Sequence, residues 1–483
     1  MAIVKDWRED KLNTALSVAW MITVVSAFFG SVFTLFELPA LGAVYPFRLV
    51  LPITAVLYLI WAIREKHNPW KHATKAQRAC YILGTVLVAY GAVSLLRAID
   101  VVFTLQRLMN LCLDLCFFFL ALELCRNRRI LRKTVYCIVG TLIIQIPLGI
   151  YEVFFGGVFD PLYDTDRHLF RFFGGKYQRP VVASGNTNDF SMMLVFMLAI
   201  LLLYWAWQHR EEKTDWIPIG FIAPTYFLIC AGDARLCWLA FWLLMVGFVA
   251  VVLTIRPIKR WVVVLTVLLM VVTLFGMNYH ELALKKPASK APAKTPTAST
   301  STAAPSGNDR KETSSSSPNR TLKEEMFTVD DQTGEVSFNL NYSAGARMDL
   351  LFHAGNCLLH SDGFGVGLGN TEQLAKENAA SRMGGVWNIH CFLARMAADF
   401  GVFFLIPALI LAFLLLREVI GGLWESLRAK KWTKAALWLL YLVAMVSYPI
   451  ASTAPSDAQD CLTMWLFLAV VVLLPTHFHQ TQQ

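Results

Sequence analysis

The chain has 483 residues, of which 56% are apolar and only 16% are charged, and its mean hydropathy is +0.51. An average soluble chain has about 25% charged residues. Here the apolar residues fall in runs of about 20, the length that a helix needs to cross a bilayer. The composition predicts an all-α polytopic membrane protein and excludes a soluble enzyme, a disordered protein and a secreted disulfide scaffold. The net charge of +9 does not indicate nucleic-acid binding, because basic loops orient membrane proteins.

Twelve apolar stretches predict about 12 transmembrane helices. In chain order they lie at roughly 13–34, 44–63, 79–97, 107–125, 134–155, 187–207, 216–232, 236–255, 261–279, 391–416, 433–453 and 460–475. Residues 1–279 then hold helices 1–9, and residues 280–390 form a large extracytoplasmic loop before the tenth span. Residues 391–483 hold helices 10–12 and a short cytoplasmic tail.

Lysine and arginine residues are unevenly divided between the two sets of loops. One set carries 20 of them, namely Arg64, Lys66, Lys71, Lys75, Arg78, Arg126, Arg128, Arg129, Arg132, Lys133, Arg210, Lys213, Arg256, Lys259, Arg260, Arg417, Arg428, Lys430, Lys431 and Lys434. The short loops of the other set carry seven, namely Arg97, Arg107, Arg167, Arg171, Lys176, Arg179 and Arg235. Because cytoplasmic loops are the more basic ones, both termini are expected in the cytoplasm and the long loop outside it.

The long loop divides into two parts by composition. Residues 285–320 consist mainly of Ala, Lys, Pro, Ser and Thr. They bury too little apolar surface to offset the entropy of ordering, so disorder is predicted there. Residues 345–390 are predicted to form a structured lid. It begins with an amphipathic helix on the membrane surface, Gly345 to His360, followed by glycines at alternate positions of 361–370, a pattern typical of a flexible turn.

Four residues on the outer side stand out, because positive charge is disfavoured in short outer loops. Arg179 precedes the sixth span, Arg235 lies in a tiny turn between two spans, Arg347 begins the amphipathic helix, and His390 lies where the chain re-enters the bilayer. Guanidinium groups bind phosphate in a bidentate manner, and a histidine can act as a general base near neutral pH. The combination suits a lipid-linked phosphate or pyrophosphate with an attacking hydroxyl group.

Simpler explanations exist for each residue taken alone. A lone interfacial arginine is usually a membrane anchor, Arg235 can pair with Asp233, and a lone histidine at a helix start is more often structural. Asn186 and Asn188 suit a helix N-terminus and, with Asn388, are candidate supporting residues. The chain has no CxxC pair and no clear acidic pair in its outer loops, so neither a metal site nor a cofactor is expected.

Four stretches resemble motifs of the O-antigen ligase and O-antigen polymerase superfamily of bacterial membrane glycosyltransferases. They are Arg179 followed by Ser-Gly-Asn-Thr-Asn-Asp-Phe-Ser (184–191), Ala-Gly-Asp-Ala-Arg-Leu-Cys (231–237), Arg347 leading to Gly-Phe-Gly-Val-Gly-Leu-Gly-Asn (363–370), and Asn-Ile-His-Cys-Phe-Leu-Ala-Arg (388–395). They lie in order over roughly 179–415, about half of the chain. The chain departs from the family at Cys391, where asparagine often follows the histidine, and at Asp233 and Ala234, where serine often precedes the arginine.

The resemblance implies an enzyme that uses a glycan carried on undecaprenyl pyrophosphate at the outer face of the bacterial plasma membrane. It would transfer this glycan to an acceptor sugar hydroxyl with inversion at the anomeric carbon, without nucleotide or metal. Carried over residue by residue, Arg179, Arg235 and Arg347 would hold the pyrophosphate, and His390 would accept the proton of the acceptor. The implied partners are this donor, a glycan or lipid-linked glycan acceptor and membrane lipids, with no nucleic acid.

Two questions stay open at this point. A transporter or flippase of lipid-linked saccharide should show repeated halves with charges near the bilayer midplane. The charges singled out above lie on one face instead, which favours the enzyme. Polysaccharide polymerase and O-antigen-type ligase catalyse the same transfer and differ in the acceptor, so the sequence does not separate them.

Overall fold

The computed structural model describes most of the chain. The described residues are 10–38, 42–156, 169–173, 175–208, 217–254, 260–284, 327–329, 336–338, 342–379, 388–453 and 461–480. The predicted disorder of 285–320 lies outside these residues, as does part of the lid predicted over 345–390.

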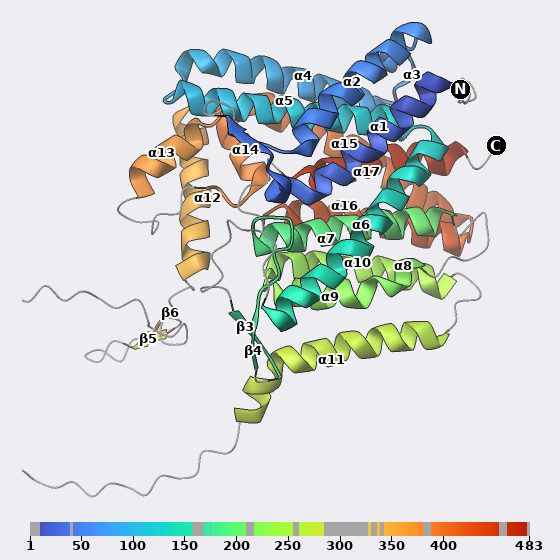
Figure 1. The fold of residues 1–483 in the computed structure, drawn as a ribbon, viewed down its shortest axis with the longest axis vertical. Helices are drawn as coiled ribbons and strands as arrows, with labels where there is room; N and C mark the ends of the chain where they lie inside the picture. Colours follow the sequence, from blue (N-terminus) through green and yellow to red (C-terminus); the bar gives the residue numbers. More distant parts are fainter. Residues whose placement is uncertain are drawn as a thin grey trace, which may run out of the picture.

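The described residues form a helical bundle (Figure 1). Nine of its helical stretches are long and apolar enough to cross a membrane: α1 (Lys11–Phe29), α2 (Pro46–Arg64), α4 (Lys75–Ser94) with the turn η2 (Leu95–Arg97), α5 (Val101–Leu124), α6 (Arg128–Phe155), α7 (Thr187–Gln208), α10 (Arg235–Thr254), α15 (Val402–Arg428) and α16 (Trp432–Ala451). Shorter apolar segments occur in α8 (Ile217–Gly220) with α9 (Ile222–Ala231), in α11 (Arg260–Leu284) and in α17 (Leu462–Gln480). Eleven of the twelve predicted spans overlap these elements along most of their length, and the tenth, 391–416, overlaps α15 only from Val402. The all-α polytopic fold class is confirmed.

The remaining elements are short. The helical ones are η1 (Gly30–Phe33), α3 (Pro69–His72), α12 (Tyr342–His360), α13 (Asn370–Ala379) and α14 (Phe392–Phe400). Three antiparallel hairpins pair β1 (Phe36–Leu38) with β2 (Gly42–Val44), β3 (Leu169–Phe172) with β4 (Gly175–Gln178), and β5 (Phe327–Val329) with β6 (Val336–Phe338). No sheet larger than two strands occurs in the part of the chain that the structure describes.

Two helix starts show how the sequence sets the helix boundaries. The Asp10 side chain accepts a hydrogen bond of 2.8 Å from the backbone N–H of Asn13 and caps α1. Thr74 and Gln77 form a capping box at α4, in which each side chain accepts from the backbone N–H of the other residue, at 3.2 and 2.9 Å. Such caps satisfy N–H groups that have no partner inside the helix.

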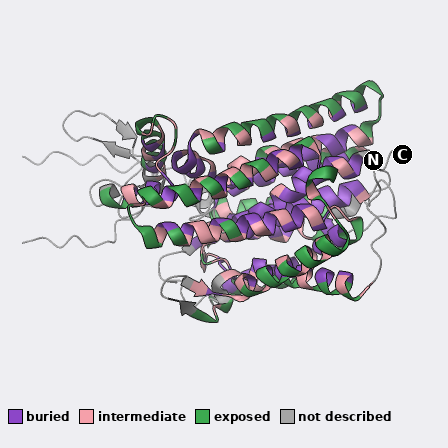
Figure 2. Ribbon diagram, turned by 90° about the horizontal axis from the view of Figure 1, so that it is seen from above, coloured by how far each residue is buried: buried purple, intermediate pink, exposed green. Residues whose placement is uncertain are grey.

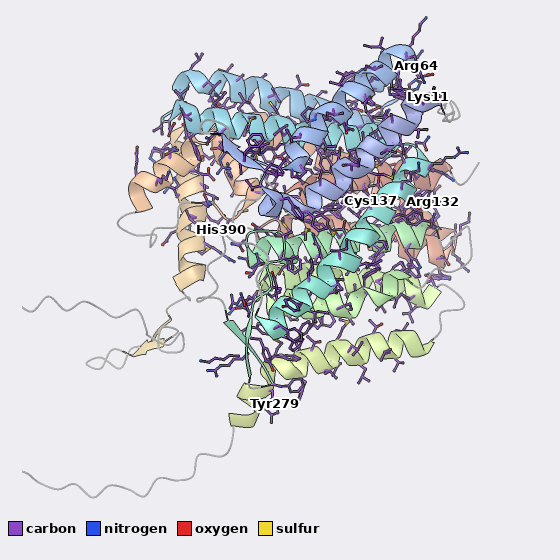
Figure 3. All side chains as sticks on the ribbon, viewed as in Figure 1. Lys11, Arg64, Arg132, Cys137, Tyr279 and His390 are labelled. Atoms are coloured by element: carbon purple, nitrogen blue, oxygen red, sulfur yellow. The ribbon has the colours of Figure 1, made fainter. Side chains whose placement is uncertain are left out.

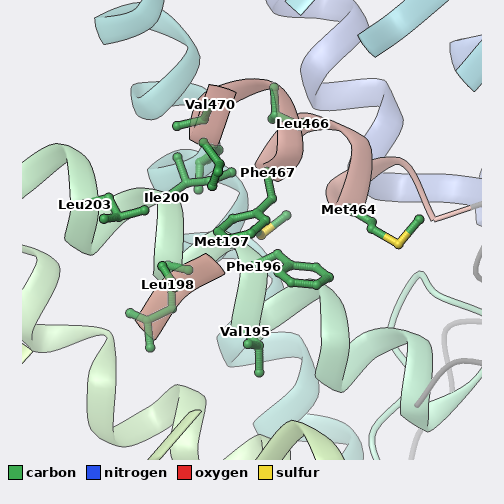
Figure 4. Packing of buried hydrophobic residues seen from close by; sticks show 14 of the residues in the cluster. Val195, Phe196, Met197, Leu198, Ile200, Leu203, Met464, Leu466, Phe467 and Val470 are labelled. Carbon is green, nitrogen blue, oxygen red and sulfur yellow. The ribbon is translucent and has the colours of Figure 1, made fainter. Parts of the chain in front are cut away.

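The central helix of the bundle is α7. It is apolar on all sides, which is typical of a helix with no face toward water or lipid, and its apolar span is buried throughout. Helices α6, α9, α10, α16 and α17 pack against it. Phe196 of α7 stacks on Phe467 of α17 with ring centroids 4.8 Å apart (Figure 4), and buried residues run through the middle of the bundle (Figure 2). The two ends of α7 are therefore held at the centre of the bundle.

The two ends of the bundle differ in what they carry. Both chain termini lie at one end (Figure 1), and Arg64 and Arg132, from the more basic set of loops, lie there too (Figure 3). At the opposite end α12 runs crosswise to the spans, and His390 lies beside it (Figure 3). We call this opposite end the outer end, following the division of basic residues between the loops.

The stretch predicted as the tenth span, 391–416, is two helices rather than one. Gly401, with a φ of +55°, separates α14 from α15, and a Cβ atom there would lie 2.2 Å from the carbonyl oxygen of Gly363. Arg395 and Asp399 are buried on α14, and charged groups of this kind are unfavourable on a helix surrounded by lipid. The candidate membrane span therefore begins at Val402, and α14 belongs to the outer end.

The amphipathic helix predicted at Gly345 to His360 is present as α12. Together with α13 and α14 it forms a layer across the outer end, which we call the outer layer. This layer has a small core of its own, made of Leu350, Ala354, Cys357, Ala375, Ile389 and Ala398. The apolar face of α12 is therefore covered in part by protein.

The glycine-rich turn 361–370 is docked onto the bundle, which corrects the prediction of a flexible turn. Gly363, Gly365, Gly367 and Gly369 all have φ between +80° and +102°, a region that glycine enters without strain. The Tyr90 hydroxyl of α4 donates to the carbonyl of Phe364 at 2.8 Å. The Asn370 amide donates to the carbonyl of Arg97 at 3.0 Å and accepts from the N–H of Ile99 at 3.1 Å. The turn thus connects the outer layer firmly to α4 and the loop after it.

Buried charges also hold the outer layer against α5. Arg107 of α5 contacts one carboxylate oxygen of Glu372 at 2.9 Å, and Arg395 contacts the other at 3.0 Å. Asp399 accepts from the hydroxyl of Thr371 and lies 3.8 Å from Arg395. All five side chains are buried, and the formal charges of the four ionised groups balance. Burial raises the pKa of Asp399, and the charge of Arg395 opposes this shift.

Glu372→Gln should loosen the outer layer, because Arg107 and Arg395 would stay buried without the carboxylate that they share. Removal of one partner of a buried ion pair costs about 3–5 kcal/mol. Thermal unfolding in detergent and the rate of proteolysis within 361–400 measure the effect. Glu377→Gln, at an exposed position of the same helix, is the matched control. Equal unfolding temperatures for the two variants would contradict this role of Glu372.

Candidate functional site

The segment that carries Arg179 is fixed to α6 before α7 begins. Glu152, a buried residue of α6, accepts hydrogen bonds of 2.8 Å from the backbone N–H groups of both Val181 and Val182. Val182 has a φ of +51°, which a β-branched residue adopts only where its surroundings impose it. The Glu152 carboxylate therefore determines the path of the chain directly after Arg179.

The outer end of α7 lies next to the turn that carries Arg235. Asn186 caps α7, and its side chain accepts from the backbone N–H of Asn188 at 2.8 Å. A Cβ atom at Gly232 would lie 2.5 Å from the Ser191 hydroxyl, so the turn packs closely against α7 at this glycine. Both α7 and α10 begin at this place. Their free N–H groups and helix dipoles favour an anion there.

Arg179 reaches across to the same turn. Its Nη2 atom lies 2.9 Å from Oδ2 of Asp233, and the two side chains are 26% and 43% exposed. The Nε atom of Arg179 is buried and has no hydrogen-bond partner among the described residues. Leaving a buried donor without a partner is costly. A ligand that accepts a hydrogen bond from Nε would remove this cost.

Arg235 and Arg347 lie near the same carboxylate. Arg235 is exposed at the first residue of α10, and Arg347 is half-buried on α12. Burial lowers the pKa of Arg347, the positive charge of Arg235 lowers it as well, and the charge of Asp233 raises it. Such influences weaken with distance, so Arg347 lies within the electrostatic field of Arg235 and Asp233. We call Arg179, Arg235 and Arg347 the arginine cluster; with Asp233 it retains a net positive charge.

His390 is positioned by the outer layer. It is half-buried and directly follows Ile389. Ile389 packs in the same small core as Leu350 of α12. Leu350 lies one helical turn after Arg347. Asn388 is half-buried as well, and its side-chain oxygen has no hydrogen-bond partner within the described stretches. His390 and Arg347 are thus held by the same structural layer, beside the outer end of the bundle (Figure 3).

The structure brings together the three arginines that the sequence singled out, although they come from separate segments. Asn186 caps α7, with Asn188 as its partner, and the roles of His390 and Asn388 stay predictions. The sequence analysis missed Glu152. An acidic residue inside an apolar run was the available signal, since charge at membrane depth usually has a partner.

The arrangement suits an anion rather than a metal ion. The arginines of the cluster lie near the N-termini of α7 and α10, and together their guanidinium groups can bind several oxygens of a phosphate group. No group of three or more His, Cys, Asp or Glu side chains suited to a metal ion occurs in the described stretches. The site therefore offers positive charge and hydrogen-bond donors at the outer end.

Comparison with known proteins shows a partial similarity. No family model matches the chain. A stretch of 140 residues is 30% identical to the teichuronic acid biosynthesis protein TuaE of Bacillus subtilis (strain 168). The stretch covers 29% of this chain and 28% of that relative, so the similarity spans less than a third of either protein. The structure itself establishes a multi-pass helical membrane protein.

Glu152→Gln should weaken the hold on the Arg179 segment, because a neutral amide accepts the two backbone hydrogen bonds less strongly than a carboxylate. Hydrogen bonds to charged groups contribute about 1.5–3 kcal/mol, so the unfolding temperature and the affinity for inorganic pyrophosphate should both fall. Thermal unfolding and titration calorimetry in detergent measure these changes. Tyr151→Phe, at the neighbouring exposed position, is the control. An unchanged pyrophosphate affinity in Glu152→Gln would exclude the positioning role.

Proposed function

We propose that this chain is a membrane glycosyltransferase of the O-antigen ligase or polymerase type. It acts at the outer face of the bacterial plasma membrane, with both termini in the cytoplasm. It transfers a glycan from undecaprenyl pyrophosphate to a sugar hydroxyl. The similarity to a teichuronic acid biosynthesis protein supports the coarser statement that the chain takes part in the biosynthesis of a cell-wall polysaccharide. The more specific proposal, transfer of a glycan from undecaprenyl pyrophosphate to a sugar hydroxyl, rests on the arginine cluster and His390.

In the proposed reaction the acceptor hydroxyl oxygen attacks the anomeric carbon from the face opposite to the phosphate. The new bond between this oxygen and the anomeric carbon forms while the bond from that carbon to the phosphate oxygen breaks, so the configuration inverts. His390 takes the hydroxyl proton. The electron pair of the broken bond goes to the pyrophosphate, and the arginine cluster balances the added negative charge. Metal and nucleotide take no part in this scheme.

The convergence of Arg179, Arg235 and Arg347 is the observation that carries the proposal. A single arginine at the membrane interface is explained as an anchor, but anchors have no reason to gather at one point. Like charges repel at short range, so their proximity is favourable when an anion lies among them. A pyrophosphate group offers several oxygens to the planar guanidinium groups.

A transporter or flippase of lipid-linked saccharide is the alternative function. Its binding site would lie near the bilayer midplane, in broken helices of two repeated halves. Here α7 is unbroken and buried along its apolar span, and the arginine cluster lies at the helix ends. This placement favours chemistry at the membrane surface over passage through the bundle.

Purified protein in detergent allows a direct test of transfer. Incubated with a short glycan on undecaprenyl pyrophosphate in the presence of EDTA, it should release undecaprenyl pyrophosphate. Longer glycan in the products would identify a polymerase, and release without extension would identify a ligase that lacks its acceptor. Failure to release the carrier from any such donor would favour the transporter.

His390→Ala should reduce transfer by at least about 100-fold, the lower range for loss of a general base, while the protein stays folded in the membrane. The rate of carrier release under the same conditions measures this effect. His360→Ala changes an exposed histidine at the end of α12 and should keep normal activity. Wild-type activity in His390→Ala would exclude the base assignment.

Arg235→Lys should reduce transfer about 10- to 100-fold, because lysine keeps the charge but loses the fork of donors that binds phosphate, and charge-assisted hydrogen bonds are strong. Initial rates at several donor concentrations measure the loss. Arg171→Lys, at an exposed position of β3, is the matched control on the same side of the protein. Near-normal activity of Arg235→Lys would instead support a role as a membrane anchor.

A further inference from the structure

Asp233 pairs with Arg179 and lies near the rest of the arginine cluster, where an anion-binding site would not be expected to hold a carboxylate. Its Oδ2 atom is 2.9 Å from Arg179, its charge acts on Arg347, and it is two residues before Arg235. Asp233 has a φ of +54°, which aspartate tolerates in a tight turn. The turn holds this carboxylate at the position where the arginines would otherwise face an anionic ligand.

The contact between Asp233 and Arg179 is suited to exchange. The two side chains are partly exposed, and exposed ion pairs add little to stability. The carboxylate satisfies Nη2 of Arg179, while Nε has no partner among the described residues. A phosphate group can bind both nitrogens in a bidentate manner. The pyrophosphate as a whole also carries more negative charge than a carboxylate, so it can replace Asp233.

We propose that Asp233 is an internal counter-ion of the arginine cluster, which occupies Arg179 in the empty site and is displaced by the pyrophosphate of the substrate. This inference rests on the proposed function for the identity of the ligand. It names a residue that sets how tightly the site holds pyrophosphate. It also explains how three arginines can lie together in a partly buried place before a substrate arrives.

The counter-ion affects both the binding of the donor and the release of the carrier. The donor and the released carrier both contain a pyrophosphate group, so both compete with Asp233 for Arg179. A site without this carboxylate would bind the donor more tightly but would also hold the released carrier longer. Asp233 thus keeps the affinity low enough for the carrier to leave.

The test is a binding measurement on the full chain in detergent, with undecaprenyl pyrophosphate and inorganic pyrophosphate as probes. Asp233→Asn keeps the size of the side chain and its tolerance of positive φ but removes the charge. We expect this variant to bind both probes about fivefold more tightly, the size expected for loss of one exposed ion pair. The gain should shrink at high salt. In the transfer assay KM and kcat should fall together.

Three further variants make the result specific. Asp362→Asn changes another exposed aspartate with positive φ, +52°, and should bind like the wild type. In an Arg179→Gln background, Asp233→Asn should give no gain, because the carboxylate acts through that arginine. The inference would be overturned if folded Asp233→Asn bound pyrophosphate no more tightly than the wild type. It would also be overturned if Asp233→Asn gave the full gain in affinity in the Arg179→Gln background.

The outcomes separate this inference from the proposed function. If the wild type transfers glycan and Asp233→Asn shows no gain in affinity, the counter-ion role is wrong and the function stands. If the gain appears but no donor gives transfer, the function is wrong and the counter-ion role stands. If the wild type binds neither probe, both are wrong.

Discussion

A charged side chain that leaves water has to be balanced by an opposite charge or by hydrogen bonds, and the outer end of this bundle meets that requirement in two ways. Around Glu372 the charges balance: Arg107 and Arg395 share its carboxylate, Asp399 supplies the second negative charge, and all four side chains are buried. In the arginine cluster positive charge is in excess, and the ion pair of Arg179 with Asp233 is partly exposed. The balanced group around Glu372 holds the outer layer against α5. The arginine cluster keeps a net positive charge and can therefore bind an anion.

The cluster has a fixed position because its parts are attached to α7, which faces protein on all sides. Gly232 brings the turn of Arg235 against the first turns of α7, and Glu152 fixes the segment of Arg179 from α6. The positions of two of the three arginines, Arg179 and Arg235, are therefore set by contacts of the backbone near them rather than by contacts of their own side chains. A site built in this way is preorganised, which is the condition for strong electrostatic stabilisation of a developing charge.

The sequence predicted the spans well because hydropathy over about 20 residues reports directly on the bilayer. The predictions were wrong where the structure depends on a few local residues or on tertiary contacts. The start of the tenth span was placed at 391, because a few charged residues hardly change a mean hydropathy, although Arg395 and Asp399 were visible there. Alternating glycines suggested mobility, yet their turn is held by Tyr90 and Asn370. The residue types of the arginine cluster could be predicted, but their convergence depends on helix packing that spacing does not encode.

The proposed base belongs to the outer layer, whereas two of the three arginines of the proposed phosphate site belong to the bundle, which constrains the mechanism. Arg179 and Arg235 are attached to the bundle through α6, α7 and α10, whereas His390 and Arg347 are held by the outer layer. In an inverting transfer the base and the leaving group lie on opposite faces of the sugar, so the proposed reaction depends on how the base and the arginines of the bundle are placed relative to one another. The distance between them is then set by how the outer layer docks onto α4 and α5. In the proposed reaction, contacts that never touch substrate, such as those of Glu372 and Asn370, would therefore influence how the hydroxyl and the pyrophosphate are aligned, since small misplacements of reacting groups are costly.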